Sequence, residues 1–469
     1  METRTFPQLA SGGANSAYYP SSVATATAQV RSFKRWQADV KNPLRIVAYY
    51  VALIYTFTIF AQLHQLVGMA VGFDTHMLMI IGVPMVLLVL ISEGVQRTLR
   101  WKVAQYWLAF SVWMVISLPF SIWKSASIWV VLAWLRVEVL ILFVIAGCVL
   151  TWRELKRLMT VLAWAAAVDV LTGRLIAGQI VGRLELTGTT MSDPNDYAAQ
   201  LILVLPCLLL VVISSRSVVS RIVAAGVLLY GIFLLLLTGS RGGLVALCAA
   251  VLFCLWKLRP GQKVVVAAIV LLLTCLAMSI LPKQIQTRFS ATFKSAESAD
   301  ADPDVERAVE SSEARNYLLK QSIWATLSHP LFGIGAGQFS NYEGLKARAE
   351  GQHGAWHETH NSYTQISSEM GIPALVFFLG ATIWTYRLLN KVYRGAQKRP
   401  RNRENQQIKI TAFCLMVSLA GYCVASFFLS LGYRFYMPAL SGLAIALYRA
   451  AQQKWQSETV APSSGPVAV

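Results

Sequence analysis

Long apolar runs recur along almost the whole chain and decide what it can fold into. Each of twelve runs comes close to the ~20 residues that a helix needs to cross the hydrocarbon core of a bilayer. The runs are 46–66, 76–92, 103–121, 126–149, 155–173, 197–214, 219–238, 242–258, 262–281, 367–387, 408–430 and 435–451. Only 14% of the 469 residues are charged, against about 25% in soluble domains. We predict an all-α polytopic membrane protein with about 12 transmembrane helices.

The runs divide the chain into five parts. We expect a disordered cytoplasmic tail at 1–43, nine spans at 44–281, one long periplasmic loop with amphipathic helices at 282–366, three spans at 367–452 and a second tail at 453–469. The first tail is rich in small polar residues and has no apolar core that would indicate a cleavable signal peptide. All seven cysteines lie inside apolar runs, so we predict no disulfide framework.

The basic residues indicate the orientation. Lys and Arg gather in the cytoplasmic loops of membrane proteins. With the N-terminus inside, about two thirds of the 41 Lys and Arg fall in the tails and in the short loops on the cytoplasmic side. Both termini are then cytoplasmic in a bacterial inner membrane, and the long loop and all six histidines face the periplasm. The net charge of +18 follows from this distribution and requires no nucleic-acid partner.

A titratable cluster stands where the long loop returns to the membrane. The stretch HGAWHETHNSY contains His353, His357 and His360, and Asn361 follows directly. A histidine with an ordinary pKa near 6.5 can take a proton from a hydroxyl. We interpret His353 and His357 as interfacial polar residues without an assigned role. Because ATP and nucleotide sugars are cytoplasmic, chemistry at the outer face needs a substrate that carries its own energy.

Arginines in the short outer loops are candidates for anion binding. Arg183, Arg241 and Arg434 lie there, and for each one alone the plainer interpretation is a side chain that extends to lipid phosphate. Arg241 differs because it lies in the very short turn LTGSRGGL. Ser240 and the following glycine amides would add donors at the start of a helix. A diphosphate at the outer membrane surface fits this arrangement.

Four other segments have structural interpretations. The pattern at 312–327 predicts an amphipathic helix, and GIGAGQF at 333–339 predicts a tight turn rather than a dinucleotide site, since no strand precedes it. The acidic run at 297–313 lacks the spacing of a calcium loop and is typical of a solvated face. DPND at 193–196 predicts a helix start, with Asp196 as a possible cap.

These motifs, in this order, resemble the O-antigen ligase and polymerase superfamily of bacterial cell-surface polysaccharide synthesis. The motifs are the DPND segment after an arginine, LTGSRGGLVAL, HPLFGIGAGQF and HETHNSYTQISSEMGIPALVFFLG. The resemblance covers residues 45–450, and its most specific part is 237–380. It implies a metal-independent, inverting glycosyltransferase without a cofactor. Such an enzyme moves a glycan from undecaprenyl diphosphate to a hydroxyl of a glycan, lipid or protein acceptor.

The resemblance also assigns residues. His360 matches the family's histidine before Asn-Ser-Tyr and would activate the acceptor hydroxyl. Arg241, Arg183 and, as a looser match, Arg315 would bind the donor diphosphate. Three further residues are expected to contact the acceptor or support the site: Asn361, Ser240 and Arg434.

A lipid-linked oligosaccharide flippase, or another polysaccharide transporter, is the alternative. Such a protein would need basic residues lining a cavity through the spans, and only Arg136 lies well inside an expected span, since the other basic residues of the runs stand close to a run's end. A non-catalytic scaffold is a third possibility, for which His360 would be dispensable. The sequence leaves open the sugar, the acceptor and the choice between ligase and polymerase.

Overall fold

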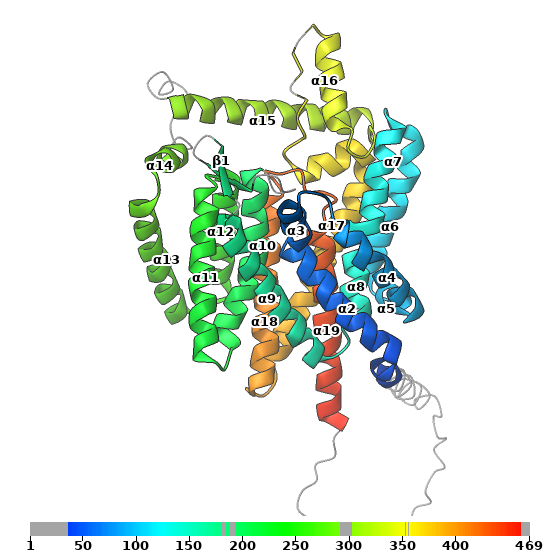
Figure 1. Cartoon of the computed structure of the whole chain (residues 1–469), viewed down its shortest axis with the longest axis vertical. Coiled ribbons are helices and arrows are strands. Elements are labelled where there is room, and N and C mark those ends of the chain that lie inside the picture. Colours follow the sequence, from blue (N-terminus) through cyan, green and yellow to red (C-terminus); the bar gives the residue numbers. More distant parts are fainter. Residues whose placement is uncertain are drawn as a thin grey trace, which may run out of the picture.

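Helices run side by side in a bundle, and at one of its ends one helix lies across them while another projects away (Figure 1). The computed structural model describes residues 36–175, 177–180, 183–186, 193–290, 303–351, 353–354 and 356–460. We call the end with α15 (Pro303–Ser328), which lies across the bundle, and α16 (Phe339–Ala349), which projects from it, the loop end. The opposite end, where the described chain begins and ends, is the tail end.

Every expected apolar run is helical. The helices from Pro43 to Ile280 are α2 (Pro43–Phe60), α3 (Leu63–Val71), α4 (Met77–Ile91), α5 (Gly94–Leu99), α6 (Lys102–Ser117), α7 (Lys124–Ala133), α8 (Leu140–Cys148), α9 (Trp152–Leu175), α10 (Pro194–Ser214), α11 (Val218–Leu237), α12 (Arg241–Lys257) and α13 (Pro260–Ile280). Of these, α5 lies between the second and third expected runs, where a loop was expected. Those that follow are α14 (Lys283–Ser290), then α15 and α16, then α17 (Ser362–Gln397), α18 (Arg403–Ala425) and α19 (Tyr436–Val460). Among the described residues, eight helices are long and apolar enough to cross a membrane. This confirms the polytopic α-helical class but does not establish the count of twelve.

Several details differ from expectation. The run 46–66 is two helices, because Gln62 adopts a left-handed backbone with φ of 50° and ends the first of them. The run 126–149 contains a π-helical turn at Trp134–Glu138. A two-stranded antiparallel hairpin, β1 (Ala177–Ile180) and β2 (Arg183–Leu186), was not expected. Its residues follow the polar end of α9, where backbone groups need partners outside a helix.

The chain ends also depart from the expected boundaries. Residues 1–35 of the expected first tail and 461–469 of the second lie outside the described residues. Residues 36–41, which were assigned to the first tail, are helical. The helix α19 continues to Val460, past the expected end of its run. Most of the acidic run 297–313 also lies outside the described side chains.

The glycine-rich loop packs against a kink in α17. Gly333, Gly335 and Gly337 all have positive φ, which confirms the tight turn. Gly371 has φ of 82°, and a Cβ there would lie 1.9 Å from the Leu331 carbonyl oxygen. The Glu369 carboxylate accepts hydrogen bonds from the Gly337 amide (2.7 Å) and the Phe339 amide (3.2 Å). This carboxylate therefore holds the loop in place.

The helices are unequally buried. α10 contacts α9, α11, α12 and α18 and buries most of its residues. In contrast, α13 buries none of its residues, and Figure 1 shows it at the edge of the bundle. A helix that is apolar all round and exposed fits a lipid environment rather than water. The bundle therefore has a packed centre and at least one helix surrounded by lipid.

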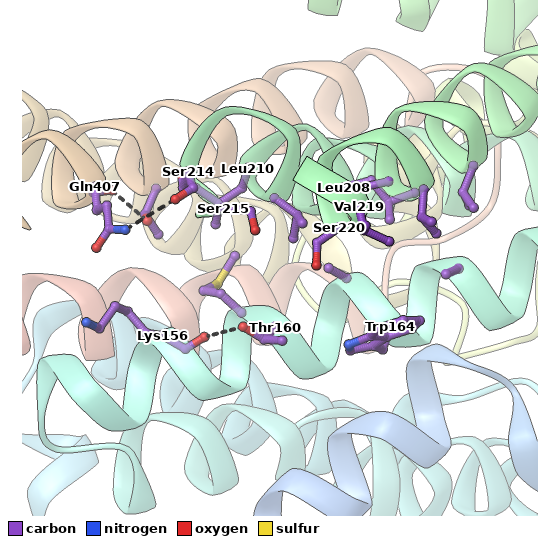
Figure 2. A pocket seen from close by; sticks show the side chains of 18 of the residues that line it. Lys156, Thr160, Trp164, Leu208, Leu210, Ser214, Ser215, Val219, Ser220 and Gln407 are labelled. Carbon is purple, nitrogen blue, oxygen red and sulfur yellow. Dashed lines mark hydrogen bonds between the residues drawn. The ribbon is translucent and has the colours of Figure 1, made fainter. Parts of the chain in front are cut away.

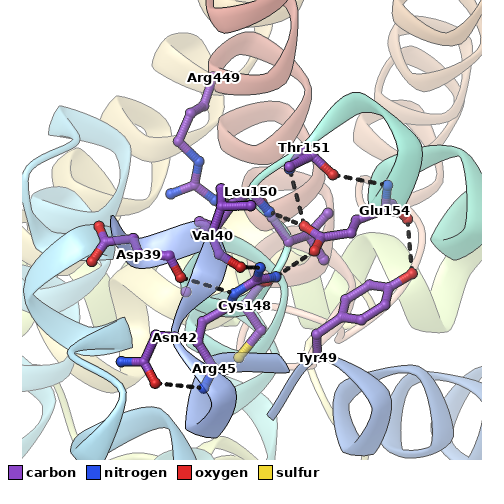
Figure 3. A network of polar contacts seen from close by, with 12 residues as sticks. Asp39, Val40, Asn42, Arg45, Tyr49, Cys148, Leu150, Thr151, Glu154 and Arg449 are labelled. Atoms are coloured by element: carbon purple, nitrogen blue, oxygen red, sulfur yellow. Dashed lines mark hydrogen bonds and ion pairs between the residues drawn. The ribbon is translucent and has the colours of Figure 1, made fainter. Parts of the chain in front are cut away.

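Three buried arginines bind the C-terminal end of α8 near the tail end (Figure 3). Arg45 donates to the Cys148 carbonyl and pairs with Glu154, Arg97 donates to the Gly147 carbonyl, and Arg449 donates to the carbonyls of residues 146 and 149. The last carbonyls of a helix have no partner inside it and carry partial negative charge. These arginines supply those partners and are therefore structural, although the positive-inside count included Arg45 and Arg97 with the basic residues of the cytoplasmic segments.

Candidate functional site

The turn between α11 and α12 places Arg241 at the loop end. Thr238 ends α11, Gly239 follows with φ of 57°, and Ser240 is the N-cap of α12. The Ser240 hydroxyl accepts a hydrogen bond from the Gly243 amide at 3.0 Å. Ser240 and this amide were expected to bind an anion, but in the structure they form a hydrogen bond with each other. The guanidinium of Arg241 is the group that the turn presents to the surroundings.

Two further arginines hold the carbonyl groups of this turn. Arg183, on β2, donates from Nε to the Thr238 carbonyl oxygen at 2.8 Å. Arg288, on α14, donates from Nε to the Gly239 carbonyl oxygen at 3.0 Å. A Cβ on Gly239 would lie 3.3 Å from Arg288 Cδ and 3.6 Å from Arg183 Cγ. Both arginine side chains therefore pack directly on the residue before the cap of α12.

Arg288 is not among the residues predicted from the sequence. The segment that contains it belongs to the expected long loop, but in the structure it forms α14. Ile285 and Phe289, four residues apart, are buried against α11 and α12 and turn Arg288 toward Gly239. This apolar pair at helical spacing was the available signal.

Arg183 is fixed by the start of α10 as well. Its Nη2 donates to the side-chain oxygen of Asn195 at 3.1 Å. Asp193 is the N-cap of α10 and accepts from the Asn195 amide. The predicted helix start is thus confirmed, but Asp193 is the cap and not Asp196. The motif DPND serves to hold an arginine at the turn as well as to begin a helix.

The positive charges at the loop end repel one another. The pKa of Arg183 is lowered to about 10, first by burial and then by the positive charge of Arg288, while Asp193 opposes the shift. The pKa of Arg315, on α15, is also lowered, first by burial and then by Arg241. We call Arg183, Arg241, Arg288 and Arg315 the arginine cluster; a bound anion would relieve its repulsion.

His360 lies in a non-helical loop held by the segment between α18 and α19. Its backbone has φ of 50°, a strained value for a residue with a side chain. The His360 amide donates to Ser430 Oγ at 2.9 Å, and Thr359 Oγ1 lies 3.1 Å from the same oxygen. Asn361 then caps α17 by accepting from the amides of Tyr363 and Thr364. Asn361 therefore supports the site by fixing where the helix begins.

A cavity of about 330 Å³ brings the main candidates together. Arg241 and Arg315 line it from two helices, and His360 and Asn361 line it from the loop before α17. Its other lining residues include Gly242, Val245, Ser312, Asn316, Leu319, Thr359, Phe427 and Phe428. Arg183 and Arg288 do not line the cavity, but they donate hydrogen bonds to carbonyl groups of the turn that carries Arg241. Segments separated by more than a hundred residues thus meet around one space.

Arg434 is not part of this lining. The carboxylates that act on it electrostatically are Glu138, Asp196 and Glu358, and the amide of the next residue, Phe435, donates to Glu138 at 2.6 Å. Arg434 is thus balanced by acidic groups, unlike the arginine cluster. The structure separates it from the residues with which the sequence analysis grouped it.

His360 is uncharged at neutral pH. Burial lowers the pKa of His360 to about 4, the positive charge of Arg315 and the electrostatic interaction with His357 lower it further, and Asp193 opposes them. The ring centroids of His357 and His360 are 6.3 Å apart. His353 and His357 are exposed, and the segment is not helical, so they do not share a helix face with His360. A neutral imidazole beside positive charges can accept a proton.

An apolar cavity of about 260 Å³ adjoins the first. Arg241 and Val245 line both cavities, and the second is completed by residues of α12, α13 and α14: Leu244, Met278, Gln286, Phe289 and Ser290. The site therefore has a cationic compartment and an apolar one. Within the described residues, no three His, Cys, Asp or Glu side chains are grouped in a way that could hold a metal ion.

These features define a multi-pass membrane protein with a cationic, histidine-bearing cavity at one end of its helices. Residues 226–379 match the family model described as O-antigen ligase. The match confirms the resemblance to the O-antigen ligase and polymerase superfamily, and it supports a ligase or polymerase type of activity in polysaccharide synthesis. A comparison with curated proteins found no match. The matched residues include Arg241, Arg288, Arg315 and His360, whereas Arg183 lies outside them.

Proposed function

We propose that this protein transfers a glycan from an undecaprenyl-diphosphate-linked donor to a sugar hydroxyl at the periplasmic face of the inner membrane. The observation that carries the proposal is the shared cavity of about 330 Å³, in which Arg241 and Arg315 face His360. A glycosyl diphosphate is a good leaving group, so the donor supplies the energy of transfer. The protein needs to bind the diphosphate and to orient the acceptor oxygen.

The arginine cluster would bind the diphosphate. Guanidinium groups match phosphate oxygens and stabilise the charge that develops as the leaving group departs. Arg241 and Arg315 line the cavity directly. Arg183 and Arg288 hold the turn that carries Arg241 and add positive charge behind it. The adjoining apolar cavity, lined by Val245 and other residues of three helices, suits the first units of the polyprenyl chain.

His360 would accept the proton of the acceptor hydroxyl. The acceptor oxygen attacks the anomeric carbon, the bond from that carbon to the diphosphate oxygen breaks, and the diphosphate leaves with the bonding electrons. Attack on the face opposite the leaving group inverts the configuration, and the chemistry assigns no step to a metal. The negative diphosphate would raise the pKa of His360 from about 4 toward the range of an effective base.

The position of the arginines favours this proposal over a flippase. A flippase would need cationic side chains along a path through the bundle. The arginine cluster gathers at the loop end, and the buried Arg45, Arg97 and Arg449 bind helix carbonyls near the other end. Arg136, the arginine in the middle of an expected span, is exposed on the surface of the protein.

The test is complementation of a deletion strain with full-length variants. We expect His360→Ala and Arg241→Ala to abolish surface glycan, with normal membrane levels of the protein. The matched controls are His357→Ala, an exposed neighbour, and Arg348→Ala, an exposed arginine of α16 at the same end. Wild-type amounts of surface glycan from His360→Ala would contradict the proposal and favour a scaffold.

Mass profiling of the lipid-linked glycans in the same strains would separate the two acceptor classes. Accumulation of single repeat units on the carrier indicates a polymerase, because chain extension has stopped. Accumulation of long chains on the carrier indicates a ligase, because extension continues and only the final transfer fails. A reporter fused near Asp302 checks the sidedness, and cytoplasmic reporter activity there would contradict the proposed site.

A further inference from the structure

A second large cavity lies near the tail end, far from the arginine cluster. It has a volume of about 340 Å³ and is formed by α9, α10, α11 and α18 (Figure 2). Its walls are mostly apolar, and Trp164 and Val219 on its rim are 59% and 71% exposed. Exposed apolar side chains on a membrane protein face lipid. The cavity is therefore accessible from the side of the bilayer.

The polar residues of this cavity gather at one end. Figure 2 shows Lys156, Gln407 and Ser214 at that end, and Trp164 toward the other. Gln407 Nε2 lies 3.5 Å from the Ser214 carbonyl oxygen, which is a weak contact. The Ser214 hydroxyl is buried and has no hydrogen-bond partner among the described residues. An amphipathic ligand could satisfy this end and fill the apolar one.

A basic cavity adjoins the polar end. It has a volume of about 360 Å³, and Arg216, Arg221 and Arg403 line it together with Ser214 and Gln407, which the two cavities share. Arg221 is fixed at the rim because its Nε donates to the Ser215 carbonyl oxygen at 3.0 Å. Neither cavity is lined by a carboxylate; Glu404, which follows Arg403 in the chain, lies 3.9 Å from Lys156 and also pairs with Lys454. The junction therefore carries a net positive charge.

We infer that these two cavities form a binding site for one anionic diacyl phospholipid. The acyl chains would occupy the apolar cavity, and the phosphate would lie in the basic one, beside Arg216 and Arg403. Basic pockets between helix ends recognise anionic headgroups in this way. A soluble phosphate would leave the apolar cavity unused, and a zwitterionic lipid would not complement the three arginines. The inference does not depend on the proposed transfer reaction.

The experiment is native mass spectrometry of the full-length protein with defined lipids. Dioleoyl phosphatidylglycerol and dioleoyl phosphatidylcholine have the same chains and differ in headgroup charge. We expect the wild type to retain the anionic lipid preferentially. The double variant Arg216→Gln/Arg403→Gln should bind it about 25-fold more weakly, which corresponds to about 2 kcal/mol for two arginine–headgroup contacts. Val223→Trp, at the exposed mouth of the apolar cavity, should weaken binding of both lipids.

The matched control is Arg153→Gln, an exposed arginine near the same end that lines neither cavity. It should bind the anionic lipid like the wild type, which separates a local site from general surface charge. Equal retention of the two lipids by the wild type would overturn the inference. Wild-type affinity for the anionic lipid in the double arginine variant would also overturn the inference. The same holds if millimolar glycerol 3-phosphate, which has a phosphate but no acyl chains, displaces the lipid.

Discussion

Ser430 holds His360 in its strained conformation, and its removal is the most specific test of the site geometry. The His360 amide donates to Ser430 Oγ at 2.9 Å, and the Thr359 hydroxyl lies 3.1 Å from the same atom. The left-handed backbone of His360 costs about 1–2 kcal/mol. The contacts with Ser430 oppose this cost. Ser430 also hydrogen-bonds the Glu358 side chain, and in the described hydrogen-bond network it contacts no residue of the arginine cluster. Its role is therefore to position His360 and the loop that carries it.

The magnitude follows from the two contacts. A hydrogen bond inside a protein contributes about 1 kcal/mol net. Ser430→Ala removes both, so the competent conformation of the His360 loop is disfavoured by about 2 kcal/mol relative to relaxed conformations. This corresponds to a loss of up to about 30-fold in the rate of transfer. The KM for the donor should stay nearly constant, because the arginine cluster is unchanged.

The assay uses full-length protein in lipid nanodiscs and the lipid-linked glycan that accumulates in the deletion strain. Single-turnover rates and donor KM values are compared for Ser430→Ala, Ser430→Thr and the wild type. Ser430→Thr keeps the hydroxyl and should restore most of the rate. Ser328→Ala, which removes an exposed hydroxyl from the end of α15, is the control. A wild-type rate for Ser430→Ala would refute the argument, as would a loss that appears only in the donor KM.

Three further perturbations test other parts of the structure. Because the pKa of His360 is lowered to about 4, the base is already deprotonated at pH 6. The value of kcat/KM should therefore change little between pH 8 and pH 6 and fall only in more acid solution. A fall in kcat/KM centred at or above pH 6.5 would contradict this prediction. Gly371→Ala should prevent folding or lower thermal stability severely, because its Cβ would overlap a loop carbonyl oxygen at 1.9 Å. The control Gly226→Ala, in α11, should be neutral or slightly stabilising, because no atom lies within 4 Å of the added Cβ. Arg45→Gln leaves the partly buried Glu154 carboxylate without its ionic partner and should lower the free energy of unfolding by about 3–5 kcal/mol, measured by thermal unfolding. Glu458→Gln breaks the more exposed pair with Lys454 and should lower it by about 0.5 kcal/mol or less. Similar losses for the two variants would show that burial does not govern the strength of the pair.

Much of the architecture could be predicted because it depends on local composition. A run of about 20 apolar residues forms a helix in lipid whatever its neighbours are, since every backbone group finds its partner within the run. The start of α12 at Ser240 and that of α17 at Asn361 are set by side chains that cap the next few amides. His360 and Arg241 could be named for the same reason, because each lies at a short motif beside a helix start.

The membership of the site required the tertiary structure. Arg288 reaches the Gly239 carbonyl, and Ser430 reaches the His360 amide, across long stretches of chain. No local pattern in the sequence indicates which distant residues form these hydrogen bonds. Arg434 shows the converse, since it resembled the other outer arginines in sequence but lies among carboxylates.

The sequence by itself determined the class of protein, the position of its long apolar helices and four residues that line the candidate cavity: Arg241, Arg315, His360 and Asn361. Only the tertiary structure decided which charges share a cavity and which titration state His360 adopts. The physical reason is that helix formation in a membrane is satisfied within one segment, whereas a pKa depends on burial and on charges from every segment packed nearby. For His360 those charges are Arg315 on α15, Asp193 before α10 and His357 on its own loop.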